Sequence, residues 1–573
     1  MKITNRYLVQ ICLLAAMLGA GAARGAGLSV YGTLARFSWF TNTAGQNVEF
    51  QAVARDSAGN IYVGGNFSGS VLTIGSLSVT NTFSAVTCAF ILKVDSAGNP
   101  LWLVGQIGRV GYSSIDSIIV DGQDAFIYVT GTTTSTGISQ NLKIGTCTLC
   151  STTIINTHTV GFIYKYSGAG VGQNVKVLGT SSVYSEADLN AIASDNSIAV
   201  SGKVVGSGTF NGVALSSRTA SITDGYVWVG NFNEVAKWGV TSTDTNPTPG
   251  STAPYVTFNA VTFDSATNVI AVGSFIGNAM TNDLQSPDLY SGLVAKWDSS
   301  GNLLWDAALQ GTNLAGTYAD CVAVDAADNI YIGGRTSWNN PASPATLAIQ
   351  GQTPGVSASY PLLGAVDGYL AKLNSAGDPQ WITGAGGAGA AVAGYANFHR
   401  LAIAGTNVYV GGLEGLSNAA AILFGGKIPV LESNAGFVAA FSTNDGSVTW
   451  VKTLPQGTPT PLDLTPQGLA VQTNGDVLLA GMQNSSAGSA ADSYVATVSA
   501  TQSNQWPWVF ISASNQLPTM TWYGSGTLVA ATSLASPAWQ VVVTNWPATN
   551  NQYQFTDGSV TNTPKRFFRQ SVP

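Results

Sequence analysis

Gln51-Ala-Val-Ala-Arg-Asp-Ser-Ala-Gly-Asn-Ile-Tyr-Val-Gly-Gly65 is the stretch that decides the fold of this chain. Its centre, Asp56–Asn60, predicts a tight turn, because Asp hydrogen-bonds to nearby backbone and both Gly and Asn tolerate positive φ. Apolar residues lie on both sides of this turn, at Ala52–Ala54 and Ile61–Val63. The stretch therefore predicts a β-hairpin.

A second hairpin of the same composition follows after a loop. It reads Ala89-Phe-Ile-Leu-Lys-Val-Asp-Ser-Ala-Gly-Asn-Pro-Leu-Trp102, and its turn, Asp95–Asn99, repeats the residues of the first. The strands around both turns are apolar on both faces rather than alternating, so we expect a sheet that is covered on both sides. The two hairpins together predict a four-stranded sheet that needs a neighbour on each face.

This unit recurs along the chain in seven copies, called repeat units one to seven below. The first hairpins span Ala52–Gly65, Ile118–Gly131, Ala191–Gly202, Ala260–Gly273, Cys321–Gly334, Leu401–Gly412 and Leu469–Gly481. The third strands are expected to begin at Phe90, Phe162, Tyr226, Leu293, Tyr369, Phe437 and Tyr494, and several carry a lysine (Lys93, Lys165, Lys296, Lys372). The expected fourth strands carry Trp102, Trp238, Trp305, Trp381, Trp450 and Trp508, whereas unit two has Val175-Lys-Val177. Strands of constant length joined by loops of variable length are typical of a repeat scaffold.

Seven such sheets, packed face to face around an axis, predict an all-β chain with a seven-bladed β-propeller of four-stranded antiparallel blades. The pattern resembles the SBBP (seven-bladed β-propeller) repeats of secreted bacterial proteins. Those repeats run apolar-Ala-Val-Asp, then Gly-Asn-x-Tyr-Val-x-Gly, then Phe-Val-x-Lys-x-Asp and Trp, and the resemblance covers about residues 40–510. It implies this fold and hardly any chemistry.

The first segment of the chain has the features of a secretory signal peptide. Lys2 and Arg6 precede the apolar run Tyr7–Leu18, which leads into small residues, so we assign residues 1–26 to the signal. The run is shorter than the roughly 20 residues that a membrane-spanning helix needs. We therefore expect a protein that is secreted, extracellular or on the cell surface, with the periplasm as another possible compartment and no membrane span after cleavage.

The remaining chain divides into a propeller, residues 28–512, and a small C-terminal β module, residues 516–573, in which short strands alternate with Gly, Pro and Asn turns. Leu34–Phe40 resembles a stray fourth strand, and we expect it to close the ring by pairing with the last blade. Trp508 would then be surplus, or would itself form that outer strand.

The composition excludes some classes of partner. Charged residues are 9% of the chain, against roughly 25% in ordinary soluble domains, and the net charge is −7. Nucleic acids and anionic membranes require basic stripes, and the longest run of basic residues here is Lys565-Arg566. We expect a monomer whose partner is an extracellular polysaccharide or a surface protein, and no nucleic acid.

Histidine and cysteine offer few catalytic possibilities. The two histidines, His158 and His399, are expected to be partly exposed loop residues. Cys147 and Cys150 lie in the loop of unit two, where a local disulfide is plausible in an oxidising compartment. Cys88 is an alternative partner for either of them, and Cys321 is expected to be a buried free thiol.

Acidic residues are further candidates for metal-binding or catalytic groups. The turns Asp56–Asn60, Asp298–Asn302 and Asp325–Asn329 resemble calcium loops, but they supply one or two carboxylates against the about six to eight oxygens that calcium takes, so we interpret them as plain hairpin turns. The glutamates within the ring do not recur at one place in the repeat; they are Glu186, Glu234, Glu414 and Glu432. No catalytic, cofactor-binding or metal-binding residue is assigned from the sequence.

One segment, Ala440–Trp450, resembles a blade of the pyrroloquinoline-quinone dehydrogenases. Those enzymes have eight blades and adjacent cysteines at the cofactor, whereas this chain has seven units and no Cys-Cys pair. We therefore interpret the likeness as a shared turn-and-Trp packing device and expect no cofactor.

The function predicted from the sequence is a non-catalytic interaction scaffold that binds a glycan or a protein through loops on one face. Trp338, beside Asn339 and Asn340 in a variable loop, is a possible ligand-stacking residue. The alternatives are a lyase or glycoside hydrolase at the channel mouth and a structural surface-layer component. Convergence of two or three carboxylates or a histidine at the channel mouth would favour the enzyme.

Overall fold

The fold is taken from a computed structural model of the full chain. It describes residues 35–40, 48–81, 87–96, 99–106, 111–134, 140–141, 144–145, 153–154, 159–177, 184–193, 195–219, 222–231, 236–242, 255–280, 284–339, 344–387, 394–415, 422–426, 428–430, 435–453, 463–472, 475–484, 492–498, 510–514, 517–523, 527–531, 540–543, 552–556 and 567–571. Over these residues the chain is all-β and contains no helix, and so none that is long and apolar enough to cross a membrane.

Repeat units one to three each form a four-stranded antiparallel sheet in chain order. Unit one consists of β2 (Val48–Arg55), β3 (Ile61–Phe67), β6 (Cys88–Val94) and β7 (Pro100–Gly105). Unit two consists of β8 (Ser113–Val120), β9 (Phe126–Thr134), β12 (Thr159–Ser167) and β13 (Gly172–Val177). Unit three consists of β14 (Tyr184–Ile192), β15 (Ile198–Val205), β18 (Asp224–Gly230) and β19 (Ala236–Thr241).

Units four to six pair in the same order. Unit four consists of β20 (Tyr255–Phe263), β21 (Val269–Ala279), β22 (Leu284–Trp297) and β23 (Leu303–Thr312). Unit five consists of β24 (Leu314–Val324), β25 (Ile330–Trp338), β28 (Val366–Leu373) and β29 (Pro379–Gly387). Unit six consists of β30 (Tyr395–Ala404), β31 (Asn407–Gly415), β34 (Ala435–Ser442) and β35 (Val448–Thr453).

The last repeat unit takes its fourth strand from the other end of the chain. It contains β36 (Asp463–Val471), β37 (Val477–Asn484) and β38 (Asp492–Val498), and β1 (Ala35–Phe40) pairs antiparallel with β38 from Ala35↔Val498 to Phe40↔Ser493. This is the partner that the sequence analysis expects for residues 34–40. Trp508, the other candidate for that edge, lies outside the described residues.

The loops between the two hairpins hold small ribbons that the sequence analysis did not predict. They are β4 (Val71–Ile74) with β5 (Leu77–Thr80), β10 (Gln140–Asn141) with β11 (Thr153–Ile154), β16 (Ser207–Phe210) with β17 (Val213–Ser216), β26 (Thr346–Gln350) with β27 (Ser357–Pro361), and β32 (Ile422–Phe424) with β33 (Ile428–Val430). Two of these ribbons pair with the preceding unit, β26 with β23 and β32 with β29. An added strand there covers an edge that would otherwise present unpaired backbone groups.

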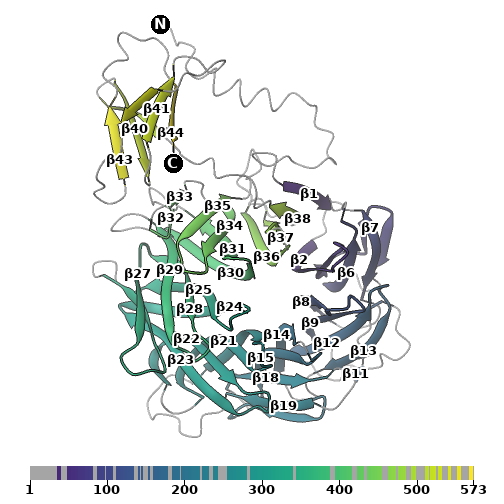
Figure 1. Ribbon diagram of the computed structural model, residues 1–573. Helices are drawn as coiled ribbons and strands as arrows, with labels where there is room; N and C mark the ends of the chain where they lie inside the picture. Colours follow the sequence, from purple (N-terminus) through teal and green to yellow (C-terminus); the bar gives the residue numbers. More distant parts are fainter. Residues whose placement is uncertain are drawn as a thin grey trace.

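Each sheet packs against the next, as the apolar faces of the sequence require. The first strands of successive units contact one another, and β36 contacts β2, so the last unit also contacts the first (Figure 1). The cores lie between sheets: one joins Phe50 and Phe90 of unit one to Leu478 and Ala480 of unit seven. The described chain is therefore all-β and propeller-like, with its first strands innermost.

Tryptophans of the fourth strands pack against turns of the next repeat unit. The indole of Trp102 in unit one lies over Gly170 in a turn of unit two, where an added Cβ would be 2.8 Å from the ring. Trp238 on Gly301, Trp305 on Gly377 and Trp381 on Gly446 repeat this contact. Each of these glycines has a positive φ. The Gly of the hairpin turn is thus needed both for its backbone conformation and to admit the neighbouring ring.

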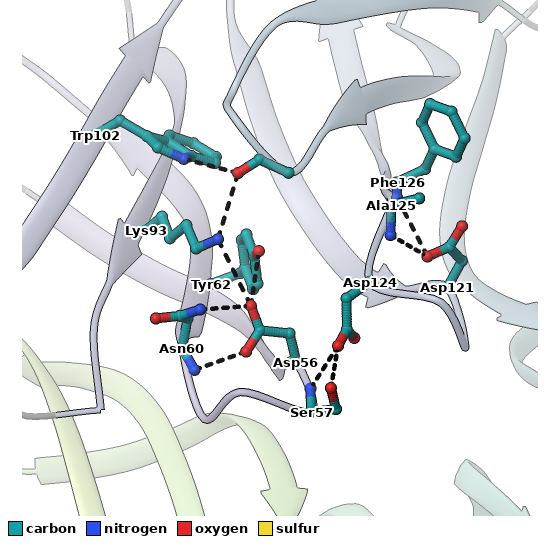
Figure 2. A network of polar contacts seen from close by, with 11 residues as sticks. Asp56, Ser57, Asn60, Tyr62, Lys93, Trp102, Asp121, Asp124, Ala125 and Phe126 are labelled. Atoms are coloured by element: carbon teal, nitrogen blue, oxygen red, sulfur yellow. Dashed lines mark hydrogen bonds and ion pairs between the residues drawn. The ribbon is translucent and has the colours of Figure 1, made fainter.

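The Asp turns are hairpin turns whose carboxylates are satisfied within the protein. Asp56 accepts from the backbone N–H of Asn60 at 2.7 Å, from the Asn60 amide at 2.8 Å and from the Tyr62 hydroxyl at 3.0 Å (Figure 2). Burial alone would raise the pKa of Asp56, but these bonds and Lys93, whose Nζ is 3.6 Å away, lower it below 3.8 overall. Asp325–Asn329 and Asp298–Asn302 repeat the two Asn bonds.

The third-strand lysines join these turns to the next unit. Lys93 Nζ donates to the Gly168 carbonyl of unit two at 3.3 Å, and the Trp102 indole donates to the same oxygen at 3.2 Å (Figure 2). In unit four, Lys296 pairs with Asp264 at 2.9 Å and donates to Ser375 of unit five at 3.0 Å. The lysine thus connects its own turn with the neighbouring sheet.

The C-terminal strands form two three-stranded sheets. β39 (Phe510–Ser514), β40 (Leu517–Tyr523) and β43 (Gln552–Thr556) make one three-stranded sheet, and β42 (Gln540–Val543), β41 (Thr527–Ala531) and β44 (Phe567–Ser571) make another. The predicted signal peptide, residues 1–26, lies outside the described residues.

Candidate functional site

A β-bulge interrupts the first strand of every repeat unit at the same position. The register of each first strand shifts past one extra residue, which lies five residues before the residue that opens the hairpin turn. These extra residues are all polar: Gln51, Asp116, Asp188, Asn259, Asp320, His399 and Gln467. Bulges re-aim side chains and are frequent beside functional sites. Because the first strands are innermost, the fold brings these seven positions toward one centre.

The bulge also explains the glycine that closes each first hairpin. A Cβ at Gly334 would be 2.0 Å from the Tyr318 carbonyl oxygen, two residues before the bulge at Asp320, and a Cβ at Gly202 would be 2.0 Å from the Glu186 oxygen. Such distances exclude any side chain. The glycine of the repeat motif therefore accommodates the bulge that places the polar residue.

Four of the seven bulge residues line one pocket, with a volume of about 440 Å³. Its lining comes from units two to six and comprises Asp116, Lys203, Tyr255, Thr257, Asn259, Ser274, Tyr290, Tyr318, Asp320, Arg335, His399 and Arg400. A pocket of this size suits a small organic ligand or part of a longer chain.

Three tyrosines form one wall of the pocket. The rings of Tyr255 and Tyr290 meet edge to face with centroids 5.7 Å apart, and those of Tyr290 and Tyr318 are 5.1 Å apart. The guanidinium of Arg335 lies over the Tyr318 ring at 4.8 Å. Burial raises the pKa of Tyr318, so its phenol is protonated at neutral pH. This wall offers aromatic faces together with a hydroxyl group.

Two aspartates of the bulge set lie in the pocket in different surroundings. Burial raises the pKa of Asp116 to about 7, and Glu186 adds to this, whereas Ser114, which donates to Asp116 at 2.8 Å, and Arg400 oppose it. Burial also raises the pKa of Asp320, against the attraction of Arg335 at 3.5 Å and of Arg400. Over the described residues, one buried oxygen of Asp320 accepts no hydrogen bond. Asp116 therefore changes charge near neutral pH.

His399 and Arg400 lie side by side in β30. The pKa of His399 is lowered to about 4 by burial and by the positive charges of Arg400 and Arg335, so the imidazole is neutral at pH 7. Arg400 donates to the carbonyl of His399 at 2.9 Å. Its guanidinium has no carboxylate within ion-pair distance in the described part of the chain. These two residues supply an unpaired cation and a neutral donor or acceptor.

Two sequence-based interpretations of single residues were wrong about location. His399 is a strand residue of the pocket rather than a loop residue, because a bulge turns it toward the centre. Trp338 ends β25 and is half-buried against the core of units four and five rather than exposed in a loop. Its role in ligand stacking stays a prediction. His158 lies outside the described residues.

The cysteines divide into described and undescribed ones. Cys321 is a buried free thiol, as predicted, and its Sγ lies 3.8 Å from the Phe398 carbonyl. Cys88 is likewise free and buried, which contradicts the alternative in which it bridges to unit two; burial raises its pKa to about 11. Cys147 and Cys150 lie outside the described residues, so their disulfide stays a prediction.

The glutamates considered from the sequence do not form the site. Glu186 pairs with Lys203 at 2.8 Å beside the pocket, and Glu414 is fully buried in β31. Glu234 and Glu432 lie outside the described residues.

Three pocket residues were not predicted from the sequence: Asp116, Asp320 and Arg400. The available signal was a polar residue at a constant distance before each turn, and an arginine where the six other units have a small or apolar residue.

The described residues contain no group of three or more His, Cys, Asp or Glu side chains placed to hold an ion. The lining of the pocket supplies aromatic, cationic and hydrogen-bonding groups, which suit an organic ligand.

Comparisons with known proteins leave the family open. No protein-family model and no curated protein matches the chain. Among solved structures, it is similar to quinohemoprotein alcohol dehydrogenase from Comamonas testosteroni over 83% of this chain and 79% of that one, with 9% identity and a TM-score of 0.27. A likeness this weak carries no argument about function.

Proposed function

We propose that this chain is a secreted seven-bladed β-propeller of the SBBP type that binds a saccharide in its central pocket without transforming it. The fold part of this proposal is supported by the four-stranded sheets, by the pairing of β1 with β38 and by the contact of β36 with β2. Contacts of this kind are expected of a ring whose ends meet in one blade, and so they support the proposal. Export rests on the predicted signal peptide of residues 1–26.

The observation that carries the binding proposal is the tyrosine wall beside polar bulge residues. Sugar rings present apolar C–H faces that pack on aromatic rings, and hydroxyls that bond to side chains such as Asn259, Ser274 and Thr257. This changes the location expected from the sequence, because the proposed site is the central pocket rather than variable loops.

The experiment is a glycan array probed with the purified full protein and with a Tyr318→Ala, Tyr290→Ala double variant. Binding of one saccharide class by the wild type, lost in the double variant, supports the proposal. A control is Leu304→Ala, because Leu304 is 50% exposed and does not line the pocket. A wild-type protein that binds no saccharide would refute the proposal.

An enzyme is the second candidate, since a specific observation favours it. Asp116, Asp320 and His399 come from three different units and line one pocket, which is the convergence expected of a channel-mouth lyase or glycoside hydrolase. Any saccharide that binds should therefore be incubated with the protein and assayed for new reducing ends and for unsaturated products. Turnover that is lost in Asp116→Asn or His399→Gln would replace the binder with the enzyme.

A further inference from the structure

The positive charges of the pocket are not equally compensated. Lys203 pairs with Glu186 at 2.8 Å, and Arg335 lies 3.5 Å from Asp320. Arg400 has no such partner over the described residues, where its guanidinium donates a hydrogen bond at 2.9 Å to the carbonyl of the adjacent His399. A partly buried guanidinium that lacks a carboxylate partner is a site for an anionic ligand group.

The surroundings of His399 point the same way. Its imidazole lines the same pocket as two arginines, Arg400 from its own strand and Arg335 from β25, and the charges of both disfavour a positive charge on His399. Arg400 and Arg335 therefore bring two positive charges to this part of the pocket, beside a neutral imidazole. The negative charges of Asp116 in β8 and Asp320 in β24 partly offset these positive charges. Asp116 loses its charge as the pH falls below about 7.

We propose that the saccharide bound in the central pocket is anionic, and that Arg400 binds its carboxylate or sulfate group while the tyrosine wall packs against the sugar ring. This inference rests on the saccharide-binding function proposed above. Guanidinium matches the planar carboxylate and the sulfate oxygens with paired N–H donors, and neutral His399 adds a further hydrogen bond without competing for the anion.

The test compares three oligosaccharide series of equal length by calorimetric titration: galacturonate oligomers, sulfated galactose oligomers and uncharged galactose oligomers. We expect the wild type to bind at least one charged series about 10-fold or more tighter than the uncharged one. Arg400→Gln should weaken that charged series by about 10- to 100-fold, the range for hydrogen bonds to charged groups, and leave the uncharged series unchanged. The charged series that binds more tightly shows whether Arg400 binds a carboxylate or a sulfate group.

Two controls separate charge recognition from general effects. Lys237→Gln removes a positive charge from an exposed site, where Lys237 is 45% exposed and pairs with Asp195, and should leave every affinity unchanged. The affinity of the wild type for the charged series should fall as salt is added, which tests the inference even if Arg400→Gln fails to fold.

The outcomes distinguish this inference from the function on which it rests. Equal binding of charged and uncharged oligomers, or charged binding that neither salt nor Arg400→Gln alters, would overturn the role of Arg400 and leave saccharide binding intact. Absence of binding to all three series would overturn the inference about an anionic saccharide, whereas the glycan array separately decides whether the protein binds any saccharide.

Discussion

The carbonyl oxygen of Tyr318 lies so close to Gly334 that a Cβ atom at residue 334 would be 2.0 Å from it. This contact exists because β24 has a bulge two residues after Tyr318, at Asp320, which lines the pocket. The Gly of the hairpin motif and the polar residue of the site are therefore two parts of one structural feature, repeated in neighbouring units.

Gly334→Ala should destabilise the protein by about 3 kcal/mol or more, because a backbone atom of β24 must move to admit the methyl group. Chemical denaturation followed by tryptophan fluorescence measures this change. Gly122→Ala is the matched control, since a Cβ at Gly122 meets nothing within 4 Å, and it should shift stability by about 0.5 kcal/mol at most. Equal effects of the two substitutions would show that the bulge does not require glycine.

Lys296→Met should cost about 3 to 5 kcal/mol, because it leaves the buried carboxylate of Asp264 without its cation and breaks the bond to Ser375. The side chains of this pair are only 5% and 3% exposed. Lys237→Met removes an ion pair of similar length, 2.8 Å, that is 45% and 42% exposed, and should cost about 1 kcal/mol or less. A Lys296→Met protein as stable as Lys237→Met would refute the proposed link between units four and five.

Asp367 should make the stability fall as the pH rises from about 4 to about 7. Burial raises its pKa to about 7, against hydrogen bonds from Leu363, Tyr360 and Gly364, so the native state holds a proton that the unfolded state has released. More protons in the native state mean that the free energy of unfolding decreases with pH over this window. Relative to Asp367→Asn, the wild type should lose stability across it, as denaturation at several pH values would reveal.

Asp378 provides the comparison of opposite sign. It is only partly buried, and the backbone N–H and the hydroxyl of Thr353, each donating at 2.7 Å, lower its pKa. Relative to Asp378→Asn, the wild type should therefore gain stability as the pH rises through the acidic range and lose it as the pH falls. The same slope for both aspartates would contradict the assignment of Asp367.

Binding of an anionic saccharide should weaken as the pH rises through about 7. Asp116 ionises over this range, and the groups that act on it are Ser114 in its own strand, Glu186 in β14 and Arg400 in β30. Its negative charge then offsets that of Arg400, because the two side chains interact across the pocket. Titrations at pH 6 and pH 8 measure the change, and Asp116→Asn should bind equally well at both. A wild-type affinity that is independent of pH would argue against this coupling.

The scaffold could be predicted because its determinants are local and repeated. The turn residues Asp56–Asn60, the apolar runs and the Trp of each fourth strand are visible as a pattern, and the structure shows the corresponding four-stranded sheets. The repeated Asp turns were interpreted correctly as hairpins, since their oxygens are filled by nearby residues such as Asn60 and Tyr62.

The site could not be predicted in the same way. Asp116, Asp320 and His399 are separated by many residues in the chain, and an isolated Asp or His in a strand carries no sign of its neighbours. His399 was assigned to a loop because the bulge that directs it inward is defined by pairing between strands, as Phe398↔Gly412 and Arg400↔Gly411 show.

The amino-acid sequence alone thus determined the repeated all-β unit and its turns, because hydrogen bonding in a turn and the burial of apolar strands depend on residues a few positions apart. Only the tertiary structure decided that polar bulge residues from several units meet in one pocket beside three tyrosines, with no carboxylate of the described residues in ion-pair distance of Arg400. Proximity across the centre arises from the packing of whole sheets, which no local pattern encodes.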